Sequence, residues 1–180
     1  MGLYPGDEQG ARTWDRLVAT YKEENDMSEL DVRIVQMEPM RVASAHGFGT
    51  NPEEQAWNKI LAFAKDRGID TGDARFFGFN NPNPSPGSPN YGYEQWMTVG
   101  PDVEAEGEIE IKEIPARQYA VRRCEGLDTI TKDWQELVLW FEDSPYKQPA
   151  HWCECLEELL TPPGTQVEDY TFDLYLPIAA

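Results

Sequence analysis

Residues 90–96 read NYGYEQW and place one carboxylate, Glu94, in the middle of an aromatic stretch. Side chains alternate along an extended strand, so Glu94 shares one face with Trp96 while Tyr91 and Tyr93 share the other. A flat cation can stack on aromatic rings while a nearby carboxylate offsets its charge. These residues therefore predict a ligand-binding strand, with a Glu94 that simply faces water as the alternative.

Other site chemistries have less support in the sequence. His46 and His151 lie far apart and lack a patterned Ser, Asp or Cys partner, so we expect no hydrolytic triad. Cys124, Cys153 and Cys155 are odd in number, which favours reduced thiols over a closed disulfide framework. The single Cys-x-Cys pair lacks the second cluster that a zinc site needs. We expect no metal ligands and no cofactor, haem included.

The candidate strand must be held by other elements, and the first half of the chain predicts several. Residues 31–48 are rich in apolar and β-branched side chains and are interrupted by Pro39, which predicts a strand with a break. Residues 51–68 predict a helix that starts at Asn51 and stops at Gly68. Before them, residues 1–28 predict a helical extension with an apolar stripe at Trp14, Leu17, Val18 and Tyr21.

The second half of the chain repeats this order. Residues 107–126 again predict a strand interrupted by proline, and residues 128–146 again predict a helix. Trp57 aligns with Trp134 at an offset of 77, and the neighbouring apolar helix positions align at the same offset. Pro39-x-Arg41 aligns with Pro115-x-Arg117 at an offset of 76. We interpret the match as an internal duplication, with repeats at 31–103 and 107–178.

Each repeat continues into two further strands, so the repeating unit is strand, helix, strand, strand. Joining two such units predicts an α+β domain spanning 29–180, with one curved antiparallel sheet and two helices on one face. A central ligand cleft would lie between the repeats. Residues 80–90, NNPNPSPGSPN, predict a loop that either covers the cleft mouth or only connects strands.

Charge excludes some partners. The chain has 33 acidic and 15 basic residues and a formal net charge of −18, which argues against nucleic acid and against an anionic membrane surface. Residues 1–30 lack the apolar core of a signal peptide and are too few for a helix-turn-helix pair. No stretch approaches the about 18 consecutive apolar residues of a membrane span. We expect a single cytoplasmic domain without direct contact to DNA.

Several segments together resemble a known family. They are EPMRVASAHGFG, PNYGYEQW, IPARQYAV, WCECLEELL and FDLYLPI, spread over about residues 30–178. The set resembles the gyrase-inhibitor-like small-molecule-binding family, the effector-binding domain of AraC-type and MerR-type multidrug-responsive regulators. The middle segment is similar to that of stand-alone members. The resemblance implies a sheet bent around an aromatic pocket with a carboxylate for lipophilic cations.

The resemblance assigns the pocket carboxylate to Glu157, with Glu158 and Glu154 as the nearest alternatives. On pattern alone, LEELL is also typical of an amphipathic helix whose glutamates face water. Trp57 and Trp134, at matching helix positions, are predicted to lie in the core. Further aromatic residues are candidates for either pocket wall or core: Phe48, Tyr91, Tyr93, Trp96, Trp140, Tyr146, Trp152, Tyr170 and Tyr175.

Three functions are consistent with these residues. The first is a stand-alone sensor or sequestering protein for hydrophobic, often cationic, aromatic small molecules. The second, implied by the resemblance, is a hydrolase that opens cyclopropane rings of genotoxic natural products, with Glu157 as general base. The third is an interaction module, in which the leading helix around Trp14 and Tyr21 joins a homodimer or another protein.

Overall fold

The computed structural model describes residues 30–151 and 153–179. The predicted helical extension at 1–28 and Trp152 lie outside these residues. In chain order the elements are β1 (Arg33–Met37), β2 (Met40–Gly49), α2 (Pro52–Arg67), β3 (Phe76–Asn80), β4 (Tyr91–Thr98), β5 (Glu110–Ile114), β6 (Arg117–Glu125), α3 (Ile130–Asp143), β7 (Leu156–Leu159), the 3₁₀ turn η2 (Val167–Asp169) and β8 (Thr171–Ile178). None of the described helices is both long and apolar enough to cross a membrane.

All eight strands join one antiparallel sheet in the order β1-β6-β8-β7-β3-β4-β2-β5. The order is symmetric about its centre, where β3 of the first half pairs with β7 of the second. The two edge strands are exchanged, because β1 pairs with β6 and β5 pairs with β2. This is the predicted α+β architecture with a curved sheet. The domain boundary at residue 29 and the limits of the repeats stay predictions.

Pro39 and Pro115 divide what the sequence predicts as single interrupted strands. Proline has no backbone N–H to donate, so a ladder cannot continue through it. The chain therefore leaves one neighbour at each proline and joins another. Before Pro39 it pairs with β6, and after it with β4 and β5.

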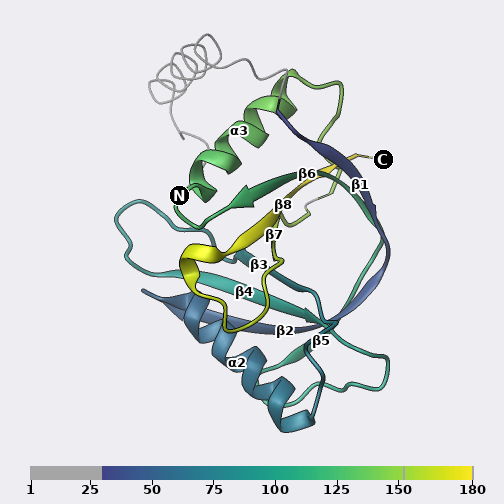
Figure 1. Ribbon diagram of the computed structural model, residues 1–180, viewed down its shortest axis with the longest axis vertical. Helices are drawn as coiled ribbons and strands as arrows, with labels where there is room; N and C mark the ends of the chain where they lie inside the picture. The colour runs from purple at the N-terminus through teal and green to yellow at the C-terminus, as the bar shows by residue number, and fades with distance from the viewer. Residues whose placement is uncertain (1–29, 152, 180) are drawn as a thin grey trace.

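The sheet curls around one apolar cluster to which every strand contributes. Met37 from edge strand β1 and Ile114 from edge strand β5 belong to the same cluster, although they lie at opposite ends of the strand order. Phe77, Trp96 and Tyr119 fill its middle and are almost wholly buried. The concave face of the sheet is therefore packed, and Figure 1 shows the strands curving around it.

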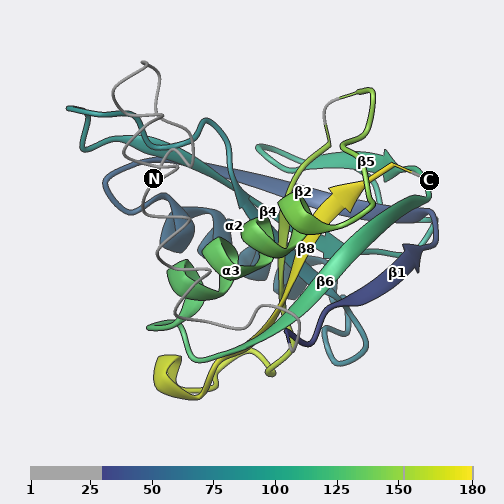
Figure 2. The same cartoon turned by 90° about the horizontal axis from the view of Figure 1, so that it is seen from above.

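The two helices lie on the other face and cover separate parts of it. Ile60 of α2 packs with Ala43 and Met97, while Leu137 of α3 packs with Ala120 in a second cluster. Helix α2 contacts β2 and β4, and α3 contacts β6 and β8. Figure 1 shows the helices apart, and Figure 2 shows α3 running beside β6 and β8. The central strands β3 and β7 thus lie between the helices.

Helix α2 begins and ends where the sequence predicts. Pro52 occupies the first turn, where its missing N–H is not needed, and Glu53 and Glu54 lie at the positive end of the helix dipole. Asn51 precedes the helix and bonds the Glu54 carboxylate through its side-chain amide instead of capping the backbone. Gly68 ends the helix in the left-handed conformation with φ of 65°, which suits glycine.

Glu94 lies on the concave face and is 4% exposed. Its Oε1 accepts hydrogen bonds from Ser44 Oγ at 2.7 Å and Trp96 Nε1 at 2.7 Å and pairs with Lys112, while Oε2 accepts from Asn81 Nδ2 at 3.1 Å. Burial alone would raise the pKa of Glu94, but these four donors outweigh it, so the pKa is lowered. The carboxylate ties β2, β4, β5 and the loop after β3 together.

We predict that Glu94→Gln destabilises the protein by about 1–3 kcal/mol at pH 7, because Lys112 loses its buried partner. The folded-state pKa of Glu94 lies below its ordinary value of 4.5. Glu94 therefore contributes its full share of the free energy of unfolding above pH 4.5. This share is lost as the pH falls through the lower folded-state pKa. Urea unfolding from pH 7 to pH 3 measures both effects, and the variant should lack this part of the acid sensitivity.

Glu110→Gln is the matched control, since Glu110 lies 3.6 Å from the same Lys112 but its side chain is 74% exposed. Exposed ion pairs contribute about 1 kcal/mol or less. Equal destabilisation by the two variants would contradict a structural role for Glu94.

Candidate functional site

The second predicted carboxylate, Glu157, lies on the opposite face of the sheet from Glu94. Partners across antiparallel strands share a face, and Glu157 pairs with Gly78, which pairs with Gln95. Gln95 directly follows Glu94, so the two glutamates point to different sides. One small ligand cannot contact both carboxylates. Glu157 faces the helices from the centre of the sheet and stays partly exposed.

Two aromatic residues hold the Glu157 carboxylate. Trp134 Nε1 of α3 donates to Oε1 at 2.9 Å, and the Tyr93 hydroxyl of β4 donates to Oε2 at 3.2 Å. Tyr93 reaches across β3 because Gly78 has no side chain, since a Cβ there would lie 2.0 Å from the Tyr93 hydroxyl oxygen. A single glycine thus brings three strands and one helix together at this carboxylate.

Among the described residues, Glu157 differs from the fully buried Asp and Glu side chains in having no basic partner. Each of those has a basic partner: Glu94 with Lys112, Asp133 and Glu136 with Arg122, Glu158 with Arg75, and Asp173 with Arg33 and Arg123. Glu157 has only the neutral donors Trp134 and Tyr93. Burial raises its pKa, the two hydrogen bonds oppose this in part, and the charge of Glu53 adds to the rise.

A second carboxylate, Glu53, lies beside the first. It belongs to the first turn of α2, and its Oε1 accepts a hydrogen bond from the Tyr91 hydroxyl at 2.7 Å. Tyr91 lies two residues before Tyr93 and on the same face of β4. Burial and Glu53 raise the pKa of Tyr91 to about 12. We call the set Glu53, Tyr91, Tyr93, Trp134 and Glu157 the interhelical site.

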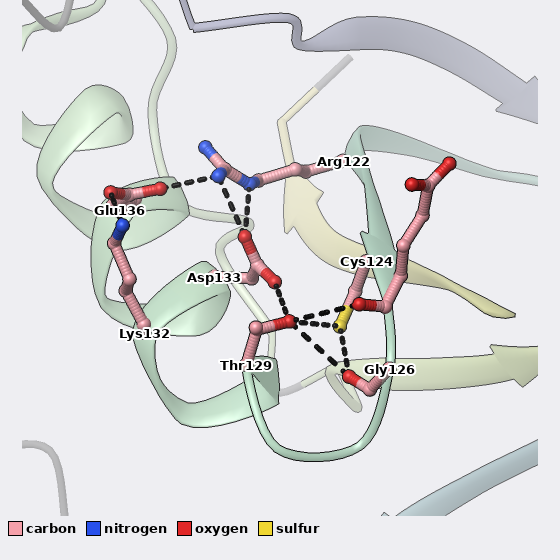
Figure 3. A network of polar contacts seen from close by, with 8 residues as sticks. Arg122, Cys124, Gly126, Thr129, Lys132, Asp133 and Glu136 are labelled. Carbon is pink, nitrogen blue, oxygen red and sulfur yellow. Dashed lines mark hydrogen bonds and ion pairs between the residues drawn. The ribbon is translucent and has the colours of Figure 1, made fainter. Parts of the chain in front are cut away.

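A polar network fixes the start of α3 and so positions Trp134. Arg122 of β6 donates to Asp133 Oδ1 through Nε at 3.0 Å and Nη2 at 2.6 Å, and it also pairs with Glu136 (Figure 3). Thr129 Oγ1 donates to Asp133 Oδ2 at 2.8 Å. Because Asp133 is bonded from two sides, the next residue, Trp134, is directed toward β7.

Comparison with protein families identifies the chain. The model of the family described as integron-associated effector binding protein (Cass2) matches residues 33–178. The chain belongs to this family. It carries the fold of the gyrase-inhibitor-like effector-binding domains, as the sequence motifs predicted. No curated protein matches the sequence significantly.

Solved structures share the architecture of this effector-binding protein. EcmrR in complex with DNA has a TM-score of 0.66 at 15% identity, and the match covers 95% of this chain and 67% of EcmrR. A hydrolase from Listeria innocua has a TM-score of 0.60 at 10% identity, covering 88% of this chain and 98% of that one. The integron cassette protein VCH_CASS2 of Vibrio cholerae has a TM-score of 0.54 at 14% identity, covering 82% and 95%. At these identities the likeness shows the fold.

Only some of the predicted pocket residues lie at the interhelical site. Tyr91, Tyr93 and Glu157 belong to it. Glu94, Trp96 and Tyr175 are buried on the concave face, where the Tyr175 hydroxyl donates to Glu158 at 2.5 Å. The ligand-binding role predicted for these three stays a prediction.

The remaining predicted aromatics lie elsewhere. Trp140 and Tyr146 stack with ring centroids 6.0 Å apart and pack beside the apolar cluster under α3, as does Tyr170. Phe48, at the end of β2, is 55% exposed. Trp152 lies outside the described residues. For these aromatics, too, a role in the pocket stays a prediction.

Sequence reasoning missed Glu53, Gly78 and Trp134 as site residues. Trp134 was predicted as core because it aligns with Trp57, and Trp57 does pack edge-on against Phe76 with centroids 5.0 Å apart. The difference lies on the facing strand, where β7 presents Glu157. Which strand faces Trp134 is decided by tertiary contacts, so the sequence held no signal for its role at Glu157.

We predict that Gly78→Ala displaces the Tyr93 hydroxyl and destabilises the protein by about 1–3 kcal/mol, as overpacking does. Gly100→Ala is the control, because a Cβ at Gly100 meets open space. Urea unfolding of Gly78→Ala in a Tyr93→Ala background completes a double-mutant cycle. In that background Gly78→Ala should lower the free energy of unfolding little more than Gly100→Ala does. If Gly78→Ala destabilises the protein as much as it does with Tyr93 present, the clash is not with Tyr93.

Proposed function

We propose that the protein binds a lipophilic organic cation at the interhelical site, as a sensor or sequestering protein. The observation that carries this proposal is that Glu157, alone among the largely buried acids of residues 30–151 and 153–179, has hydrogen bonds only from neutral donors. Its family of effector-binding proteins supports the class of function. Trp134 and Tyr93 place aromatic rings next to the charge.

The charge balance favours a positively charged ligand over a neutral one. A carboxylate with reduced access to water is stabilised by a nearby positive charge more strongly than one in bulk water. Each ring face adds about 0.5–2 kcal/mol for a cation stacked on it. A site of this kind selects for charge and flatness, so several related cations can bind.

Direct DNA binding is not part of the proposal. EcmrR is solved as a complex with DNA, whereas this chain has 33 acidic and 15 basic residues, a balance that repels phosphate. A homodimer remains a separate hypothesis that involves residues 1–28.

Hydrolysis is the second candidate, because one solved structure with this fold is named a hydrolase. The raised pKa of Glu157 and its partial exposure suit a general base. We place it second because both Glu157 oxygens already accept hydrogen bonds, from Trp134 and Tyr93. Binding needs only the charge of Glu157, whereas hydrolysis also needs a water held at one of those oxygens.

We predict that N-methylacridinium, a flat fluorescent cation, binds saturably and that Glu157→Gln weakens its affinity at least about tenfold, equivalent to 1.4 kcal/mol. Glutamine keeps the shape of the side chain and a hydrogen-bond acceptor but removes the charge. Fluorescence titration measures the affinity.

Glu142→Gln, an exposed position on α3, is the charge-matched control. Equal affinities of Glu157→Gln and the control would contradict the proposal. Separate incubation with a cyclopropane-bearing compound, followed by mass spectrometry, distinguishes binding from hydrolysis.

The same titration should depend on pH in one direction. The cation binds best to ionised Glu157, whose pKa is raised above its ordinary value of 4.5. Affinity should therefore be constant near neutral pH and fall as the pH drops through that raised value, by up to about tenfold per unit.

The nearby titratable groups include Glu53, Tyr91, Tyr93 and the thiols of Cys124 and Cys155, whose pKa values are raised by desolvation. The raised pKa values of both tyrosines keep them neutral throughout this range. The Glu157→Gln variant should lack most of the dependence. A profile that is the same in both proteins would contradict the assignment of Glu157.

A further inference from the structure

The interhelical site contains two carboxylates held in the same way. Tyr93 donates to Glu157 at 3.2 Å, and Tyr91 donates to Glu53 at 2.7 Å. The two tyrosines project from one face of β4 and are two residues apart, which is about 7 Å along a strand. The strand thus presents two tyrosine and carboxylate pairs in a row.

Neither carboxylate forms an ion pair with a basic residue of the described part of the chain. They are linked through β4, because Tyr91 bonds Glu53 and Tyr93 bonds Glu157, and the charge of Glu53 raises the pKa of both Glu157 and Tyr93. A ligand with one positive charge would neutralise Glu157 and leave Glu53 with only its neutral donor Tyr91.

The position of Glu53 in α2 does not by itself account for this arrangement. An acidic residue in the first turn stabilises a helix through the helix dipole, and Glu54 is also placed there. Glu54 is exposed and bonds Asn51 outside the site. Glu53 instead turns toward Tyr91, with part of its surface removed from water.

Resting on the function proposed above, we propose that the interhelical site selects flat organic dications, with Glu157 meeting one positive centre and Glu53 the other. The two centres would lie roughly 7 Å apart, matching the tyrosine spacing on β4. Glu53 is then the residue that distinguishes dications from monocations.

The test compares two compounds of nearly the same size and shape. The dication is N,N′-dimethyl-4,4′-bipyridinium, and the monocation is 1-methyl-4-phenylpyridinium, which lacks the second positive nitrogen. Isothermal titration calorimetry of the full chain in about 0.15 M salt limits attraction by distant surface charges to within roughly 8 Å. We expect the dication to bind at least about tenfold more tightly than the monocation.

Three single variants locate the effect. In Glu53→Gln the tenfold preference should fall to less than about threefold, while affinity for the monocation changes little. Glu54→Gln removes the same charge from the same helical turn and should keep the preference. Glu157→Gln should weaken both compounds. Circular dichroism melting of each variant checks that it is folded.

The outcomes separate this inference from the function on which it rests. If neither compound nor N-methylacridinium binds the wild-type protein, the proposed function fails. If the monocation binds as tightly as the dication, cation binding stands and the dication preference is overturned. A preference that persists in Glu53→Gln, or that Glu54→Gln removes equally, assigns it to the overall negative field and overturns the role of Glu53.

Discussion

The antiparallel pairing of β3 with β7 is the interaction on which the rest of the structure depends. It joins the two halves of the chain at the centre of the sheet and sets the register between them. In this register Gly78 lies opposite Glu157, so Tyr93 can reach the carboxylate across a position without a side chain. A shift by one residue would turn Glu157 to the packed concave face.

The two faces of the sheet treat their carboxylates differently. On the concave face, Glu94, Glu158 and Asp173 are buried with Lys or Arg partners. An ionised group without such a partner is costly to bury. These pairs hold strands together. Between the helices, Glu157 and Glu53 have tyrosine and tryptophan donors, which orient a carboxylate without neutralising it.

This contrast explains how a rigid frame can hold a site with unbalanced charge. Asp133 and Glu136 lock α3 onto Arg122, and the apolar contacts of Ile60 hold α2 on its own strands. Trp57 of α2 packs on Phe76 of β3 and Trp134 of α3 bonds Glu157 of β7, and Glu157 still keeps partial exposure. Contacts outside the site thus hold both helices on the sheet, while hydrogen bonds inside it orient Glu157 and Glu53.

By itself, the sequence determined the local elements and the side to which each residue points. Helix signals at Asn51 and Gly68, the prolines that divide the strands, and strict alternation in NYGYEQW depend only on neighbours along the chain. Alternation also separated Tyr91 and Tyr93 from Glu94 correctly.

Only the tertiary structure decided which face stays accessible and which acids meet. The curl of the sheet buries Glu94 and Trp96, and the pairing of β3 with β7 brings Glu157 under Trp134. Both depend on contacts between residues far apart in the chain, where a pattern read along one segment contains no information on the partner.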